Sequence, residues 1–495
     1  MRMAVVGALL AAAISWVATG AAVGQSMEDA ASKSKRANEL VQAGKPEEAI
    51  AIYQELAASF PGEISFKLNL GIALYKAGRY RESLKECEAL AKRRPDLFPA
   101  WLIVGASDLK LGDAAAAEEP LRQALAIQPE DPNAHIMLAD ALLALARWPD
   151  AAEQYEISAR AMRDNPRVWF GLWHSYDAMV EECFARLRQA APESAEEEAF
   201  SCELEIERGD LAGAFQHCRK ALSRRPSLRG IHAMVAKIYE GAGHADWAKV
   251  ETAKGQGDDE TCSAPTLACK FTTGRFAEIA GEKADSPEDI YWQGKAFLAL
   301  SQQAYRRVQE LPPSRESYEA TATEDEKRGL YPEAGAAWRQ ALQFEPTDRG
   351  LKHQLALALC HANDCVSALP LLKEELRHDP RSAELNYLCG LAFNSTRNPA
   401  EALPYLEAAV QLDAKFLPAR AALGEAYLEA GMPERAIAQF EAAKAEDLDG
   451  SRHYQLSRAY LATGMRDRAA ATLEEYKEIS RRAREERSQP AITPP

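Results

Sequence analysis

Cysteine is the residue type of this chain whose spacing points most directly to covalent chemistry. Six of its nine cysteines form three close pairs: Cys202 with Cys218, Cys262 with Cys269, and Cys360 with Cys365. The first pair falls on the two partner helices of one expected unit, the second flanks a proline, and the third flanks an expected helix–helix turn. A disulfide requires α-carbons within about 7 Å. We therefore hypothesise bridges at these three pairs, with buried reduced cysteine as the alternative.

No other group of chemically active residues forms a recognisable site. Ser107 and Lys110 have Ser-x-x-Lys spacing, but the accompanying motifs of serine acyl-transfer enzymes are missing. His353 and His361 fall on one expected helix, with no other metal-type ligand at regular spacing nearby. The sequence contains neither a glycine-rich loop ending in Gly-Lys-Ser or Gly-Lys-Thr nor a Gly-x-Ser-x-Gly elbow. We predict that the protein is not an enzyme and uses no cofactor or metal.

The composition is that of a soluble, acidic protein. Of the 495 residues, 47% are hydrophobic and 27% are charged, which are ordinary proportions for a globular chain. The formal net charge is −15 and the isoelectric point is near 5.3. Because nucleic-acid binding generally needs a basic face, this charge argues against a nucleic-acid partner.

The N-terminus has the order of features found in a secretory signal peptide. Arg2 supplies a positive charge, residues 4–17 form a short apolar run, and small residues at 21–24 precede Gln25. The run is shorter than the roughly 20 residues that cross a bilayer, and an uncleaved membrane anchor is the alternative reading. We expect residues 1–25 to be removed and the mature protein to be soluble in the periplasm or outside the cell, in an oxidising compartment.

The elements that would position any site follow a repeat of 34 residues. Prolines recur at this interval at Pro61, Pro95 and Pro129, and again at Pro346 and Pro380. Glycines and small residues form further ladders with the same step: Gly44, Gly78, Gly112; Gly71, Gly105, Ala139; Ala356, Gly390, Gly424; and Ala334, Ala368, Ala402, Ala436. The apolar residues between them have the three-and-four spacing of amphipathic helices. Each unit is therefore predicted to be two antiparallel helices, with small residues where they cross closely.

The turns of each unit are also predicted from residue type. Glycine ends the first helix in a left-handed conformation at little steric cost. Asn363 takes that place in one unit, and asparagine tolerates the conformation better than most residues. Proline starts the link to the next unit because it cannot continue a helix.

This repeat resembles the tetratricopeptide repeat family, whose motif runs from an aromatic residue through Leu-Gly and Tyr to Ala, Phe, Ala and a closing Pro. One unit supplies Trp101, Val104-Gly105, Ala117, Leu121, Ala124 and Pro129, with Asp108 in place of the tyrosine. Another supplies Leu423-Gly424, Tyr427, Gly431, Ala436, Phe440 and Ala443. The resemblance covers most of residues 30–475 and implies an all-α fold, an α-α superhelix (solenoid) of roughly 10–12 antiparallel helix-pair repeats of about 34 residues.

The phase of the repeat divides the chain into segments. These are a signal peptide (1–25), an N-terminal array with a degenerate last unit (26–194), a short repeat block (195–254), an irregular helical segment or hinge (255–313), a C-terminal array (314–476) and a charged, proline-containing tail expected to be disordered (477–495). For residues 255–313 we favour divergent repeats inside one continuous solenoid, because stacked repeats cover each other's apolar faces. A hinge between two halves is the alternative.

The resemblance also implies a concave groove lined by the first helices of successive units. Helical phase maps twelve candidate groove residues: Leu68, Ile72, Leu102, Ala106, Leu109, Ile136, Asp140 and Leu143 in the N-terminal array, and Tyr387, Asn394, Tyr454 and Arg458 in the C-terminal array. The N-terminal set is largely apolar and suits a partner helix or an extended segment. Packing against neighbouring first helices is the alternative for each residue.

Together these patterns predict an exported scaffold that binds protein partners, in cell-envelope assembly or secretion, without nucleic acid and without a membrane span after signal cleavage. A solenoid that binds glycans or small molecules is an alternative, as is a non-catalytic subunit of an envelope enzyme complex. The aromatic residues that would serve a glycan site are Trp169, Trp173, Tyr291 and Trp292. Such residues more often pack in the interior.

Overall fold

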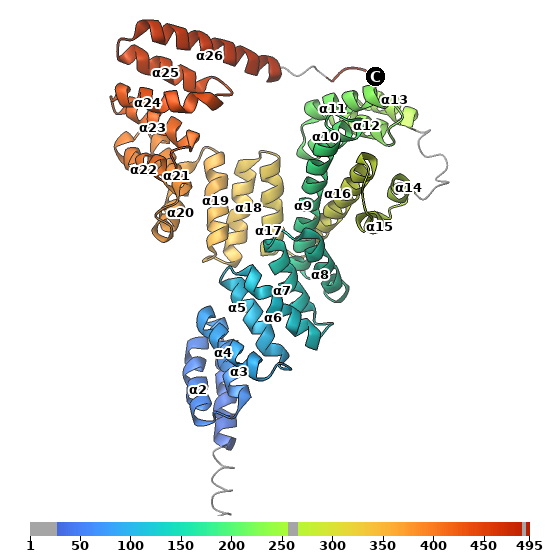
Figure 1. Ribbon diagram of the computed structural model, residues 1–495, viewed down its shortest axis with the longest axis vertical. Coiled ribbons are helices and arrows are strands. Elements are labelled where there is room, and N and C mark those ends of the chain that lie inside the picture. The colour runs from blue at the N-terminus through green and yellow to red at the C-terminus, as the bar shows by residue number, and fades with distance from the viewer. Residues whose placement is uncertain (1–26, 256–265, 488–491) are drawn as a thin grey trace, which may run out of the picture. The chain divides into compact units, whose positions relative to one another are not determined.

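The protein folds as a succession of antiparallel helix pairs. The structure is a computed structural model and describes residues 27–255, 266–487 and 492–495, so the expected signal peptide and Cys262 lie outside the described residues. Within those ranges every regular element is a helix. The all-α repeat architecture predicted from the 34-residue period is therefore confirmed (Figure 1).

The chain divides into two compact units, and the first ends at Met179. Its helices are residues 27–42, α2 (Pro46–Ser59), α3 (Ile64–Lys76), α4 (Tyr80–Arg93), α5 (Phe98–Lys110), α6 (Ala114–Ile127), α7 (Pro132–Ala144), α8 (Trp148–Ala161) and the first part of α9 (Pro166–Ala190). Besides the contacts within pairs, α3 contacts α5 and α5 contacts α7. The first helices of successive pairs are therefore neighbours.

The second unit begins at Val180, inside α9. Its further helices are α10 (Ala195–Arg208), α11 (Leu211–Arg224), α12 (Ile231–Gly241), α13 (Ala245–Gly255), α14 (Leu267–Thr272), α15 (Phe276–Ala280), α16 (Pro287–Glu310), α17 (Arg315–Lys327), α18 (Tyr331–Phe344), α19 (Arg349–His361), α20 (Cys365–His378), α21 (Ala383–Ser395), α22 (Pro399–Leu412), α23 (Leu417–Glu429), α24 (Pro433–Ala443), α25 (Ser451–Ala462) and α26 (Arg466–Arg487). From α17 onward each helix contacts the next, as in a stacked array.

The small-residue ladder lies where the two helices of a pair cross, as predicted. A β-carbon added to Gly105 would lie 2.5 Å from Cγ of Leu121, and one added to Gly424 would lie 2.7 Å from Cε1 of Phe440. Leu121 and Phe440 are themselves fully buried. A larger residue at the glycine would push the two helices apart or displace a core side chain.

The turn residues also take the predicted conformation. Gly112 has φ of 81° and Asn363 has φ of 60°, both left-handed. Ala146 stands 34 residues after Gly112 and adopts the same conformation with φ of 57°. Because a β-carbon is disfavoured there, the repeat geometry outweighs the local preference of alanine.

A hydrogen bond that the sequence reasoning missed closes the turn between units. The fourth residue of a first helix donates a side-chain N–H to the backbone carbonyl six residues earlier. The pairs are Trp101 Nε1 to Pro95 (2.9 Å), His135 Nε2 to Pro129 (2.8 Å), Trp169 Nε1 to Arg163 (2.7 Å), Asn386 Nδ2 to Pro380 (3.4 Å) and Arg420 Nε to Ala414 (2.7 Å). A carbonyl that the turn would leave unpaired is thus satisfied, and donors of different chemistry serve the same purpose.

Helices α14, α15 and α16 lie between residues 267 and 310, within the segment where the sequence repeat is irregular. Helices α14 and α15 form a short pair, and the long α16 then contacts α14 and α15 and returns to α10. Cys183 Sγ, near the end of α9, lies 3.9 Å from Oε1 of Gln293 on α16. Helix α16 therefore connects the short α14–α15 pair with α10, which lies well before it in the sequence.

The expected disordered tail is in part helical, which corrects the boundary at residue 477. Helix α26 runs to Arg487, and Ser480 Oγ donates to the carbonyl of Asp449 at 2.9 Å. Arg481 pairs with Glu478 and Glu485 along the exposed side of the helix. Charges of both signs at helical spacing stabilise the helix, although their abundance had favoured disorder.

Candidate functional site

The apolar candidates of the N-terminal array lie on three neighbouring first helices, α3, α5 and α7. Five of them are partly exposed: Leu68, Ile72, Leu102, Leu109 and Leu143. Ala106 and Ile136 are buried, with 3% and 4% of their surface exposed. Leu68 packs against the buried cluster of Leu90, Ala91 and Ala100, and Leu102 packs against the buried cluster of Phe98, Ala124 and Ala134. These two leucines therefore fill seams between helices and present only part of their surface.

Asp140, the charged candidate of this array, is engaged inside the fold. Its carboxylate accepts a hydrogen bond from the Tyr155 hydroxyl at 2.5 Å and forms an ion pair with Arg167. Burial raises the pKa of Asp140, and the Arg167 guanidinium opposes this effect. Because Tyr155 lies on α8 and Arg167 on α9, Asp140 holds three helices of the first unit together.

The C-terminal candidates have separate environments. Asn394 on α21 donates from Nδ2 to the carbonyl of Ala422 on α23 at 2.9 Å, and the Tyr387 ring lies 5.0 Å from that of Phe416. Tyr454 on α25 is 45% exposed, with its ring 5.4 Å from that of Tyr476, and Arg458 is exposed. The structure therefore leaves Tyr454 and Arg458 as accessible side chains, while Asn394 connects first helices.

The structure bonds two of the three hypothesised cysteine pairs. Cys202 on α10 and Cys218 on α11 are bridged with α-carbons 5.3 Å apart, and Cys360 and Cys365 are bridged across a turn with α-carbons 4.1 Å apart. Cys269 is disulfide-bonded, and Cys262, with which it was paired, lies outside the described residues.

The remaining described cysteines are buried thiols: Cys87, Cys183 and Cys389. Burial raises the pKa of Cys87 to about 12 and that of Cys389 to about 11. The thiolate, which is the reactive form, is therefore disfavoured at both positions.

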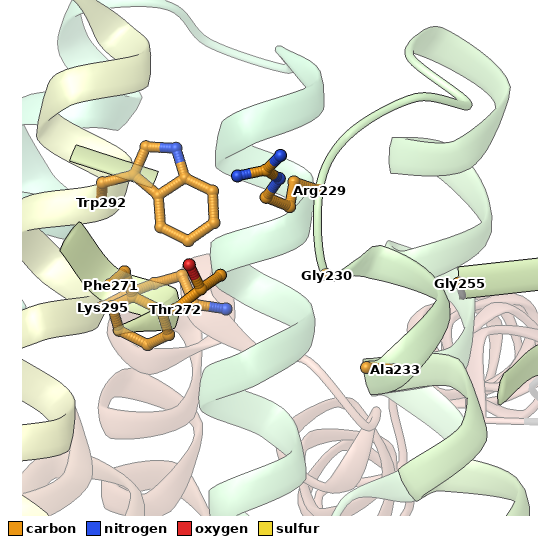
Figure 2. A pocket seen from close by; sticks show the side chains of 8 residues that line it. All are labelled: Arg229, Gly230, Ala233, Gly255, Phe271, Thr272, Trp292 and Lys295. Carbon is orange, nitrogen blue, oxygen red and sulfur yellow. The ribbon is translucent and has the colours of Figure 1, made fainter. Parts of the chain in front are cut away.

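A cavity of about 160 Å³ lies between α12, α14 and α16, in a region that the sequence reasoning assigned to packing. Its lining residues are Arg229, Gly230, Ala233, Gly255, Phe271, Thr272, Trp292 and Lys295. Figure 2 shows the rings of Trp292 and Phe271 on one side of the cavity and the Arg229 side chain across from them.

Lys295 is one of two basic residues that line this cavity, together with Arg229, and its side chain is almost fully buried. Its Nζ lies 3.0 Å from Oε2 of Glu203 on α10, and only 6% of the side chain is exposed. The same ammonium lies 5.2 to 5.6 Å from the ring centres of Phe271, Tyr291 and Trp292. Burial acts to lower the pKa of Lys295, but the nearby Glu203 carboxylate outweighs this effect, so the pKa is raised and the ammonium stays charged.

One buried polar group beside the cavity, the Trp292 indole N–H, lacks a hydrogen-bond partner among the residues that the structure describes. Burial raises the pKa of Tyr291 to about 12, so its hydroxyl is protonated. The cavity can therefore take a small apolar or aromatic group that carries a hydrogen-bond acceptor. In the sequence, the sign of this cavity is the aromatic pair Tyr291 and Trp292, followed about one helical turn later by Lys295.

The described helices include none that is long and apolar enough to cross a membrane. No cluster of three or more His, Cys, Asp or Glu side chains suited to a metal ion occurs within residues 27–255, 266–487 and 492–495.

Comparisons with known proteins place the repeats in one class. A family model described as tetratricopeptide repeat matches residues 34–98 and 353–415, and a second model with the same description matches residues 108–170 and 393–456. The Hsp70-Hsp90 organizing protein of Triticum aestivum is 30% identical over 135 residues, which are 27% of this chain and 23% of that protein. The chain thus spans less than a quarter of the length of this relative.

Two solved structures that are similar to parts of this chain have low sequence identity with it. The MamA protein is 21% identical, with 36% of this chain and 98% of that chain covered and a TM-score of 0.30. A tetratricopeptide repeat protein from Parabacteroides merdae is 12% identical, with 67% and 99% covered and a TM-score of 0.33.

Proposed function

Because this chain belongs to the tetratricopeptide repeat family, we propose that it is a non-catalytic scaffold that binds protein partners through the first helices of its N-terminal repeats. We further propose that it is exported and serves cell-envelope assembly or secretion. The partner would be an amphipathic helix or an extended segment that places apolar side chains against α3, α5 and α7.

The observation that carries this proposal is the run of partly exposed apolar side chains on three consecutive first helices. Ile72, Leu109 and Leu143 belong to it, and Leu109 and Leu143 occupy the same position of successive repeats. Apolar groups aligned at one repeat position match a partner with apolar residues at a regular interval. A partner that covers these side chains would remove apolar surface from water, which stabilises the complex by about 25 cal/mol for each Å² buried.

The test is a crosslinking pulldown from the native envelope fraction with the mature protein. The binding variant is Leu109→Glu/Leu143→Glu, and Leu68→Glu/Leu102→Glu extends the test along the same face. The control is Ala115→Glu/Ala126→Glu, which adds the same charges at exposed positions of the second helix α6. We expect specific proteins to be retrieved by the mature protein and the control, and lost with the binding variants at unchanged helicity. If the Leu109→Glu/Leu143→Glu variant still retrieves the same proteins, the first-helix face is not the binding site.

Export has its own test, because it rests on residues 1–25 alone. Arg2, the apolar run at 4–17 and the small residues at 21–24 support it. We expect N-terminal sequencing of the protein from an envelope preparation to start close to Gln25. A chain that begins at Met1 and stays with the cytosolic fraction would rule export out.

Small-molecule binding is a second candidate, and the cavity beside Trp292 supports it. An indole-sized ligand with an acceptor group would satisfy the Trp292 N–H and stack between aromatic rings. We would screen indole, indole-3-acetate and soluble glycans by thermal shift, with Trp292→Leu as the matched variant. A concentration-dependent rise in melting temperature that this variant abolishes would favour the cavity. The same melting temperature with every compound would count against it.

A further inference from the structure

A short segment near the C-terminus lies against the repeat block of α11 and α12. The Tyr239 hydroxyl on α12 donates a hydrogen bond to the carbonyl of Thr493 at 2.8 Å. Arg219 on α11 donates from Nη1 to the Thr493 hydroxyl at 3.3 Å. Ile492 and Thr493 are partly buried, whereas Pro494 and Pro495 are exposed. Two helices distant in sequence from residue 493 therefore provide donors to the same residue.

The receiving surface is rigid and aromatic. Tyr239 is 2% exposed, and its ring lies 5.6 Å from that of Phe215 and 5.5 Å from that of Trp247. The Arg219 guanidinium lies over the Phe215 ring at 5.8 Å. Since the rings are held by packing, the hydroxyl and the guanidinium are oriented before a ligand arrives. Little conformational freedom is lost when they bind, which favours affinity.

The chemistry of the segment matches this surface. Pro494 and Pro495 have no backbone N–H, and a proline after Thr493 disfavours the helical conformation at that residue and favours an extended one. Such a segment resembles a polyproline stretch, with carbonyl acceptors and little conformational entropy to lose. A surface that offers donors from Tyr239 and Arg219 is complementary to a ligand that offers mainly acceptors.

We propose that Phe215, Arg219 and Tyr239 form a docking site for an extended peptide segment that ends in prolines. Residues 492–495 of the same chain occupy this site. The tail is an internal ligand, so a partner segment of the same chemistry binds there only by displacing it. This site lies in the second unit, and it is independent of the first-helix face proposed above.

The test measures binding of a fluorescein-labelled peptide with the sequence of residues 486–495 by fluorescence anisotropy. Three forms of the protein are compared: the full chain, a chain that lacks residues 488–495, and a full-length Ile492→Glu/Thr493→Glu variant. We expect the last two to bind the peptide at least tenfold more tightly than the full chain, because their site is free. Equal binding by all three forms, or binding by none, would overturn the proposal.

Variants of the site identify where the peptide binds. In the chain without residues 488–495, Tyr239→Phe keeps the ring and removes the hydroxyl, and we expect about fivefold weaker peptide binding, the loss typical of one neutral hydrogen bond. Tyr454→Phe, at an exposed tyrosine of α25, is the matched control and should change nothing. Equal losses in both variants would contradict the site.

The molecular mass of the protein in solution shows whether the segment in the site comes from the same chain or from a second copy. A full chain that is monomeric at the assay concentration supports occupation by its own tail. A dimer that dissociates when residues 488–495 are removed would overturn this, because the tail would then come from a second copy. The Leu109→Glu/Leu143→Glu variant should bind the peptide normally, so failure of this site and failure of the proposed function are distinguishable.

Discussion

The ammonium of Lys295 on α16 lies 3.0 Å from the carboxylate of Glu203 on α10, and this ion pair joins two helices that are far apart in the sequence. Only 6% of the lysine side chain and 20% of the glutamate side chain are exposed. Lys295 also lines the cavity, and α16 contacts α10. The pair therefore lies at the contact that distinguishes this part of the chain from a simple stack of repeats.

Breaking this pair should destabilise the second unit strongly. Glu203→Gln leaves the Lys295 ammonium buried without its counter-charge, and we expect a loss of about 3 kcal/mol in the free energy of unfolding. The double variant Glu203→Leu/Lys295→Met removes both charges and should lose much less. Urea unfolding monitored by circular dichroism measures both. A double variant as unstable as the single one would show that the charges are not the source of the loss.

Close packing of α16 predicts opposite effects for two glycines in helices. A β-carbon on Gly294 would lie 2.5 Å from the Phe200 ring and 3.2 Å from Cβ of Cys183, so Gly294→Ala should destabilise by roughly 1–3 kcal/mol. Gly335 on α18 has its nearest neighbour, Leu359, at 3.7 Å. Gly335→Ala should therefore stabilise by about 0.5–1 kcal/mol through helix propensity. Thermal unfolding of both variants is the measurement, and a loss of similar size in each would contradict the packing argument.

The strained turn at Ala146 predicts a stabilising substitution. Its φ of 57° disfavours a β-carbon, so Ala146→Gly should raise the free energy of unfolding by about 1 kcal/mol. The same change at Ala126, an exposed residue of α6, should lower it by about 1 kcal/mol, because glycine weakens a helix. The denaturant midpoints of the Ala146→Gly and Ala126→Gly variants test these two expectations. A destabilised Ala146→Gly protein would show that Ala146 is not strained.

Asp108 predicts a dependence of stability on pH. It is 6% exposed on α5, and burial, together with the nearby Asp113 and Glu88, raises its pKa to about 6. Because the folded pKa is above the unfolded value, this residue favours the folded state below about pH 4 and loses that contribution as pH rises through about 6. Asp108→Asn should therefore stabilise the protein more at pH 7.5 than at pH 4. Urea midpoints at both values test this, and an equal gain at both would argue against a raised pKa.

The bonded cysteines predict a defined pattern of alkylation. In denaturant without reductant, three thiols should react, those of Cys87, Cys183 and Cys389, and all nine cysteines should react after reduction. The measurement is mass spectrometry of the protein isolated from an oxidising compartment, which gives the number of alkylated cysteines. Loss of the Cys202–Cys218 bridge should cost about 3 kcal/mol by the chain-entropy argument. An alkylation count that reductant leaves unchanged would exclude the bridges.

Much of the fold could be predicted from the sequence because the repeat is a local property. Gly105 and Leu121 meet within one helix pair, and Asn363 turns a chain between adjacent helices, so each contact spans only a short stretch of sequence. Small residues, turn residues and apolar spacing all respond to the same local geometry. Their ladders therefore indicate the helix pairs, the length of each pair and the order of the pairs along the chain.

The candidate sites were less predictable, because each depends on which surfaces remain uncovered after packing. Helical phase placed Asp140 and Asn394 on the first-helix face, but neighbouring helices supply Tyr155, Arg167 and the carbonyl of Ala422 as their partners. Phase reports the direction of a side chain from its own helix and contains no information about the next one. Of the seven apolar residues in the N-terminal set, five are partly exposed and keep accessible surface on this face.

The sequence by itself therefore determined the helix-pair repeat, its turns and its small-residue crossings, since these arise from interactions within and between adjacent units. The tertiary structure alone decided that α16 returns to α10, that Lys295 is buried beside Glu203, and that Thr493 meets Tyr239. Each of these contacts joins segments separated by dozens to hundreds of residues. No periodic signal records them, because they depend on the complementarity of two particular surfaces and not on the repeat that both segments share.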